Sequence, residues 1–249
     1  MKIYKKIIIL LILSISIPSF GFDKEKLEHR ITVGFNVGAS FPIPIPREVR
    51  TIEGWWPQFT PQFGYSILYS VDPKWSFGSG ISLDYKGMGA KDKVKYMHIE
   101  VRLEEDGEIL NGYFSGKNET RAKLSYVTVP VFARYQLSDN WYVRGGGYAS
   151  YAFSTSFKGK VWDGYLRAPD PTGMITPLEG DSKATFDFGS DIRSFDFGVL
   201  LGAERRINQK FNAFANLNWG LTPLFKKDFK AMDFEMYNLY FTLGFAYKL

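Results

Sequence analysis

Apolar and polar residues alternate with a period of two along most of the chain. In the stretch LSYVTVPVFARYQL, residues 124–137, every second residue from Val127 to Tyr135 is apolar, and polar residues such as Thr128 and Arg134 lie between them. Such alternation is typical of a β-strand whose two faces meet different surroundings. The sequence therefore predicts an all-β protein, with strands at about 30–41, 59–70, 74–85, 124–137, 140–155, 193–207, 210–221 and 235–249.

The connections between these strands alternate between short and long. Turn-forming residues fill the short connections at 71–73, 138–140 and 208–209. The long connections are about 42–58, 86–123, 156–192 and 222–234. Short turns at one end and long loops at the other are typical of bacterial outer-membrane barrels. We expect an eight-stranded antiparallel transmembrane β-barrel with short periplasmic turns, long extracellular loops and both termini on the periplasmic side.

A soluble antiparallel barrel or sandwich would also alternate, and the polar set argues against it. This set is rich in Gly, Ser, Asn and Thr rather than in Lys and Glu, so it suits a cramped polar interior better than a solvated surface. The apolar set carries aromatic residues near the strand ends, for example Trp75, Trp141 and Tyr247, as the interfacial girdles of a membrane barrel require.

The N-terminus is that of an exported protein. Three lysines precede the apolar run Ile7–Ile17, and a small-residue site, Ser19-Phe20-Gly21, follows it, which predicts a signal peptide at 1–21 and cleavage before Phe22. The remaining residues, 22–249, form one predicted barrel domain. Removing the three lysines lowers the formal net charge from +5 to about +2, so nucleic-acid binding is not expected. Without cysteine and with two histidines, the chain predicts neither a metal site nor a cofactor.

Four segments resemble the PorT-like outer membrane protein β-barrel family. They are ISLDYKGMG (81–89), LSYVTVPVFARY (124–135), FDFGVLLGAE (195–204) and YFTLGFAYKL (240–249). The resemblance implies a small eight-stranded barrel in the outer membrane of a Gram-negative bacterium and transfers no activity. The end of the chain has an apolar residue at every second position from Tyr237 to Leu249. This pattern also resembles the signal that the barrel-assembly machinery recognises, so we expect that machinery as a partner during insertion.

The predicted barrel interior contains charged residues that need partners. Arg134 and Arg144 flank the turn near Asp139 and should lie opposite each other, where like charges repel. Glu204, which lies a few residues from its own turn, is the carboxylate expected between them. We predict a structural charge cluster of Arg134, Glu204 and Arg144 rather than a catalytic site.

The long loops are the expected place of any recognition function. In the second loop, 95–103 and 108–114 flank Glu104-Glu105-Asp106-Gly107 and indicate a hairpin. The candidate recognition residues are Trp55, Trp56, His98, Trp162 and Tyr165. We expect an outer-membrane protein with a structural or interaction role and no catalysis, in contact with outer-membrane lipid and open to a protein partner through its loops. The alternatives are a narrow channel or transporter and a lipid-modifying enzyme, which would need a converging Ser–His pair.

Overall fold

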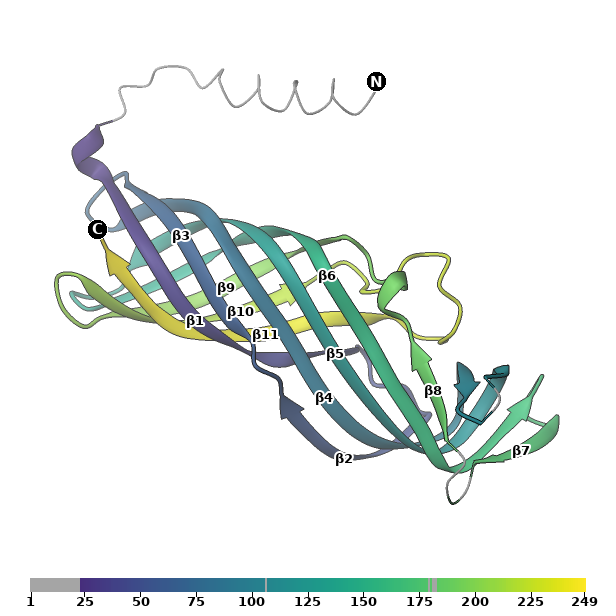
Figure 1. Ribbon diagram of the computed structural model, residues 1–249. Helices are drawn as coiled ribbons and strands as arrows, with labels where there is room; N and C mark the ends of the chain where they lie inside the picture. Colours follow the sequence, from purple (N-terminus) through teal and green to yellow (C-terminus); the bar gives the residue numbers. More distant parts are fainter. Residues whose placement is uncertain (1–22, 106, 179, 181–182) are drawn as a thin grey trace, which may run out of the picture.

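The computed structural model describes residues 23–105, 107–178, 180 and 183–249 (Figure 1). The predicted signal peptide at 1–21 lies outside these residues. In the part of the chain that is described, no helix is long and apolar enough to cross a membrane. The elements are η1 (Lys24–Lys26), β1 (Leu27–Pro42), β2 (Val49–Pro57), β3 (Pro61–Ser70), β4 (Trp75–Leu103), β5 (Ile109–Gln136), β6 (Trp141–Ala168), β7 (Met174–Leu178), β8 (Ala184–Asp187), η2 (Gly189–Asp191), β9 (Phe195–Arg206), β10 (Phe211–Gly220) and β11 (Met236–Lys248).

Eight strands pair in a closed antiparallel ring in the order β1, β3, β4, β5, β6, β9, β10 and β11, and β11 pairs back to β1. The all-β antiparallel barrel is therefore confirmed. The described chain holds eleven strands rather than the eight predicted, because β2, β7 and β8 form within the long connections and pair outside the ring. The tight turns, the start of β1 and the C-terminus lie at one end of the barrel (Figure 1).

The two faces of the ring strands differ in polarity, as the alternation predicts. On β11, Phe241, Leu243 and Phe245 point outward and are 52%, 53% and 60% exposed, whereas the alternating residues Tyr240 and Thr242 are buried in the interior. Aromatic pairs mark both rims of the outward apolar band: Trp75 with Tyr135 and Phe211 with Tyr247 near the short turns, and Tyr85 with Phe153 and Tyr151 with Phe195 at the other rim.

Three strands continue far beyond the ring. The segment 86–123, expected as a loop that carries a hairpin, is the continuous extension of β4 and β5, joined by a turn at its tip. β6 continues beside β5, β2 pairs with the extended part of β4, and β7 and β8 pair with β6. β8 also reaches the tip of β4, at Arg102 and Leu103. These strands form a curved sheet at the end opposite the short turns, which we call the extension (Figure 1).

The face that carries the apolar residues changes from the outer to the inner one where the strands leave the ring. Within the ring, the outward residues of β4 are apolar, as at Leu83, which is 42% exposed. Beyond Tyr85 the outward residues are charged, as at Lys91 and Lys93, and apolar residues such as Val94 are buried on the inner face. The apolar surface of these strands therefore faces outward on the barrel and inward in the extension.

Candidate functional site

A charged cluster fills the interior near the short turns. Glu204, on β9, is 1% exposed and accepts hydrogen bonds from Arg30 at 2.7 Å and from Arg134 at 3.0 Å. Asn212 donates to the same carboxylate, and the Arg134 guanidinium lies 4.3 Å from the centre of the Tyr142 ring. We call Arg30, Arg134 and Glu204 the lower cluster. Its carboxylate is shared by two arginines from β1 and β5, strands that are not neighbours in the ring.

Arg144 does not join this cluster in the way the sequence predicts. Arg144 and Arg134 do face each other across β5 and β6. However, Arg144 donates from Nε to Asn216 at 2.6 Å and lies over the rings of Phe132 and Phe214. Arg30 of β1 binds Glu204 instead, because closure of the ring through β1 and β11 brings Arg30 to the same level of the interior.

A second charged cluster lies higher in the barrel. Lys86 is 4% exposed, and its ammonium lies 3.9 Å from Asp196 Oδ2. The rings of Tyr126, Tyr148 and Tyr240 surround that ammonium at 5.1, 5.2 and 5.6 Å, within the range of a cation–π interaction. Tyr148 and Asn238 donate hydrogen bonds to Asp196. We call Lys86, Asp196 and the three tyrosines the upper cluster.

The two clusters leave little open volume in the barrel. The cavity between them, lined by Arg144, Tyr148 and Phe132 among others, measures about 70 Å³. That is room for a few water molecules. An eight-stranded ring is just wide enough for its own side chains, and the described interior is filled in this manner.

The extension has a hydrophobic core of its own. Phe157 of β6 is 2% exposed, and its ring lies 5.1 Å from that of Phe225 and 6.3 Å from that of Phe186. Other buried members include Ile99, Phe114, Val161, Leu166 and Leu178. The extension is therefore a packed structure rather than a set of loose loops.

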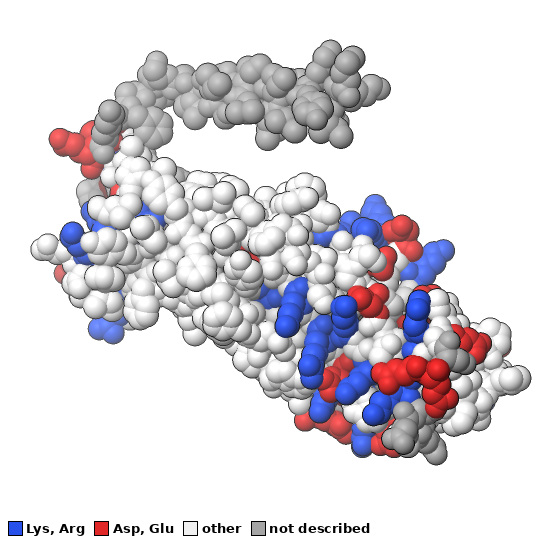
Figure 2. All heavy atoms as spheres, viewed as in Figure 1, with Lys and Arg blue, Asp and Glu red and all other residues white. Residues whose placement is uncertain are grey.

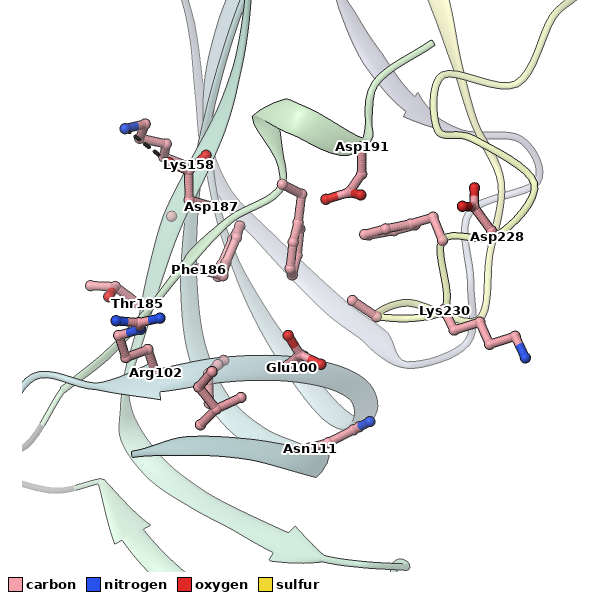
Figure 3. Close-up of a pocket in the computed structure, with 16 residues that line it drawn as sticks. Glu100, Arg102, Asn111, Lys158, Thr185, Phe186, Asp187, Asp191, Asp228 and Lys230 are labelled. Atoms are coloured by element: carbon pink, nitrogen blue, oxygen red, sulfur yellow. Dashed lines mark ion pairs between the residues drawn. The ribbon is translucent and has the colours of Figure 1, made fainter. Parts of the chain in front are cut away.

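An open cleft of about 810 Å³ lies beside this core (Figure 3). Its walls come from the β4–β5 hairpin, from β6, β8 and η2, and from the 222–234 connection, and Phe186, Phe188 and Phe229 contribute apolar surface. Four carboxylates and three cations line it, and Lys158 and Asp187 pair at 3.0 Å. The charged lining residues are Glu100, Arg102, Lys158, Asp187, Asp191, Asp228 and Lys230.

A second, mostly apolar cavity of about 330 Å³ lies between the β1–β2 connection and the inner face of the extension. Met88, Met97 and Trp55 help to line it. Asp92 lies in its wall and accepts a hydrogen bond from the side chain of Asn118 at 3.1 Å. The pKa of Asp92 is raised to about 6, mainly by burial; the hydrogen bond from Asn118 opposes this rise, and the charge of Glu53 adds a smaller upward effect.

The five candidate recognition residues lie in separate places. Trp55 lines the apolar cavity, while Trp56 lies against Gly89, where a Cβ would come within 2.1 Å of the indole ring. His98 lies 3.4 Å from Asp233 and packs edge-on to Tyr113 in another part of the extension. Trp162 and Tyr165, both on β6, lie beside Lys160 and Arg167 respectively. Their recognition role stays a prediction.

A closed antiparallel ring with an apolar outer face and a charged, filled interior defines the class of small barrels of the outer-membrane type. The chain belongs to the family described as "Outer membrane protein beta-barrel domain", whose model matches residues 21–226. This confirms the expected outer-membrane barrel family. No curated protein sequence matches the chain.

Among the solved structures that match the chain, three share about a tenth of its residues and have TM-scores below 0.5. Ail, the attachment invasion locus protein of Yersinia pestis, crystallised with the heparin analogue sucrose octasulfate, is 10% identical, with 90% of this chain and 99% of that chain covered and a TM-score of 0.40. The CymD monoaromatic hydrocarbon channel is 8% identical, with 89% and 88% covered and a TM-score of 0.24. An outer membrane channel from Pseudomonas putida F1 is 10% identical, with 90% and 94% covered and a TM-score of 0.23.

Proposed function

We propose that this protein is a non-enzymatic outer-membrane barrel whose extension recognises a molecule at the cell surface. The eight ring strands cross the membrane, the short turns and both ends of the barrel domain face the periplasm, and the extension lies outside. The observation that carries the proposal is the contrast between a filled barrel interior and an extension with its own core and an open cleft. We also retain the PorT-like type within the family as a proposal, supported by the four sequence segments that resemble it.

The height of the outward apolar band supports the membrane placement. Trp75 and Tyr85 mark the two rims on β4 and lie ten residues apart. At a rise of about 3.3 Å per residue and a tilt of about 40°, this segment spans roughly 25 Å of height, the value typical of the apolar band of outer-membrane barrels.

The filled interior argues against the alternative of a narrow channel. An open path would have to pass both the lower cluster, with its shared carboxylate at 2.7 and 3.0 Å from two arginines, and the Lys86 ammonium among three tyrosines. The enzyme alternative lacks its expected pair, because in the described chain His29 contacts Tyr65, and His98 lies beside Asp233 and Tyr113. Neither histidine hydrogen-bonds a serine there.

Recording from planar bilayers tests the proposal. The purified barrel, whose folding is verified by a heat-modifiable gel shift, should give no stepwise conductance, while a general porin run in parallel does. A reproducible unit conductance from the folded protein, lost when the protein is boiled before reconstitution, would contradict the proposal and indicate a channel.

The apolar cavity favours a second candidate function, the binding of a small apolar molecule. Its volume of about 330 Å³ lies at the lower end of the range of ligand pockets. Fluorescence of 1-N-phenylnaphthylamine should rise on adding the protein, more at pH 5 than at pH 7.5, because Asp92 is then neutral. Ala90→Phe, which fills the cavity, should abolish the rise. An unchanged signal from that variant would exclude this cavity as the binding site.

A further inference from the structure

The outer face of the extension carries a dense group of cations next to the apolar band. Beyond Tyr85, away from the short turns, neighbouring residues of β4, β5 and β6 form successive rows. The first row pairs Gly87 with Lys123, and the second pairs Gly89 with Arg121 and Arg121 with Lys158. The third row pairs Lys91 with Glu119 and Glu119 with Lys160. Lys93 and Lys117 pair in a row above. Figure 2 shows blue side chains gathered over this part of the surface. We call the group the basic belt: Lys91, Lys93, Lys117, Arg121, Lys123, Lys158 and Lys160.

One carboxylate holds three of these cations together. Glu119 has a side chain only 7% exposed and pairs with Arg121 at 2.7 Å, with Lys91 at 3.6 Å and with Lys160 at 4.0 Å. The three partners come from three neighbouring strands. Because one negative charge serves three positive ones, the group keeps a local excess of two positive charges in a fixed arrangement.

The whole belt also carries excess positive charge. Besides Glu119, the carboxylates of Glu53, Asp163 and Asp187 pair with belt lysines. Seven cations and four carboxylates leave a net charge of +3. Lys123, the cation nearest to the apolar band, has no ion-pair partner among the described residues. The belt therefore has positive charge that its own carboxylates do not neutralise, and an anionic ligand can bind this charge without breaking every existing ion pair.

The belt lies at the level of lipid headgroups. Lys123 is two residues beyond Ser125, the partner of Tyr85, which places it about 5 Å above the aromatic rim at the usual rise and tilt. Arg121 and Lys158 lie one row higher, at about 10 Å. The polar layer of a bilayer extends about 5 to 8 Å beyond each side of the hydrocarbon core, so Lys123 lies within that layer and the next row lies just above it.

We propose that the basic belt binds the phosphate groups of the outer-leaflet glycolipid, an inference that rests on the membrane orientation proposed above. Arg121, Lys123 and Lys158 contact phosphates nearest the membrane, and the upper rows contact those of the sugar region. Arginine and lysine bind phosphate through charge-assisted hydrogen bonds.

The position of the belt favours a lipid over a soluble partner. The belt continues the same outward face that carries the apolar band, so a molecule bound there extends sideways along the barrel wall into the membrane. The belt is also one-sided, because β9 and β11 begin at Phe195 and Met236, close to the rim, and carry no comparable extension. A glycolipid with acyl chains beside the barrel and phosphates above them fits both features.

Binding of fluorescent lipid A to the full chain in neutral detergent micelles tests this inference. The three probes are lipid A with two phosphates, the same lipid with both phosphates removed, and a phosphorylated disaccharide without acyl chains. The test variant combines Arg121→Gln, Lys123→Gln and Lys158→Gln. The matched control combines Lys74→Gln, Lys226→Gln and Lys227→Gln, three exposed cations outside both the belt and the cleft. Each variant must keep its heat-modifiable gel shift.

The wild type should prefer phosphorylated lipid A, and affinity should fall as salt increases. The belt variant should bind it about 100-fold more weakly, as expected for the loss of three cations worth about 1 kcal/mol each near an anionic surface, and the control should match the wild type. Equal affinity for the dephosphorylated lipid, or an equal loss in the control variant, would overturn the inference. Binding of the acyl-free disaccharide as tightly as lipid A would overturn the assignment to a lipid. None of these outcomes alters the conductance test of the proposed function.

Discussion

Substituting Glu204→Gln tests the lower cluster most directly. Glu204 is 1% exposed and is the carboxylate that lies between Arg30 and Arg134, at 2.7 and 3.0 Å. Glutamine keeps the size of the side chain and one acceptor oxygen but removes the charge. Two buried guanidinium groups would then face each other without the anion that now separates them.

The expected cost follows from the geometry. At an effective dielectric constant of 20, each ion pair at about 4 Å is worth roughly 4 kcal/mol of Coulomb energy. Glu28, which also pairs with Arg30, and penetrating water offset part of the loss. Removing one partner of a buried pair costs about 3 to 5 kcal/mol, and we expect Glu204→Gln to lower the free energy of unfolding by this amount.

Urea unfolding in micelles, followed by tryptophan fluorescence and by the heat-modifiable gel shift, measures the effect. Glu28→Gln is the matched control, because its side chain is 19% exposed against 1% for Glu204, and its loss should therefore cost less. Adding Arg134→Met to Glu204→Gln should recover at least half of the loss, since it removes one unpaired cation. Equal stability of Glu204→Gln and Glu28→Gln would refute the reasoning.

Two further predictions concern the extension. Since folding raises the pKa of Asp92 to about 6, from about 3.9 in an unfolded chain, the fold loses up to about 3 kcal/mol of stability as the pH rises from about 4 to about 6. Asp92→Asn should remove that pH dependence from the unfolding midpoints, and a retained dependence would contradict it. Phe157→Ala, at a site 2% exposed, should cost about 3 to 5 kcal/mol and accelerate tryptic cleavage of the extension while the barrel keeps its gel shift. Ile175→Ala, on β7 at a side chain that is 53% exposed, should leave cleavage unchanged, and equal acceleration by both variants would argue against an independent core.

The alternating pattern was sufficient to predict the ring strands and their faces. It was insufficient for the extension, because beyond Tyr85 the apolar residues lie on the inner face and the charged residues on the outer face. If apolar residues are expected on the outer face, the segment from Lys86 to Val94 does not fit a strand. It fits a strand if Met88 and Val94 face inward, as they do in the structure. A search for alternation with the apolar residues on either face could have found the longer strands.

The interior clusters were predictable in part. Arg134 and Glu204 could be placed near one another because each lies a few residues from a tight turn. Arg30 was missed since it is the first residue of the predicted strand at 30–41, although it has the same phase as the interior residue Thr32. Lys86 was missed because the predicted strand ended one residue earlier, so its position above Asp84 on the inner face was not considered.

Single-cysteine labelling on intact cells tests the central claim, that the extension lies outside the cell and the short turns lie in the periplasm. The natural chain has no cysteine, so Met174→Cys on β7, where the native side chain is 84% exposed, and Asp139→Cys in the β5–β6 turn each provide one thiol. A membrane-impermeant maleimide should label position 174 on intact cells and position 139 only after the outer membrane is disrupted. Labelling of position 139 alone on intact cells, or recovery of both variants in the soluble fraction, would contradict the account.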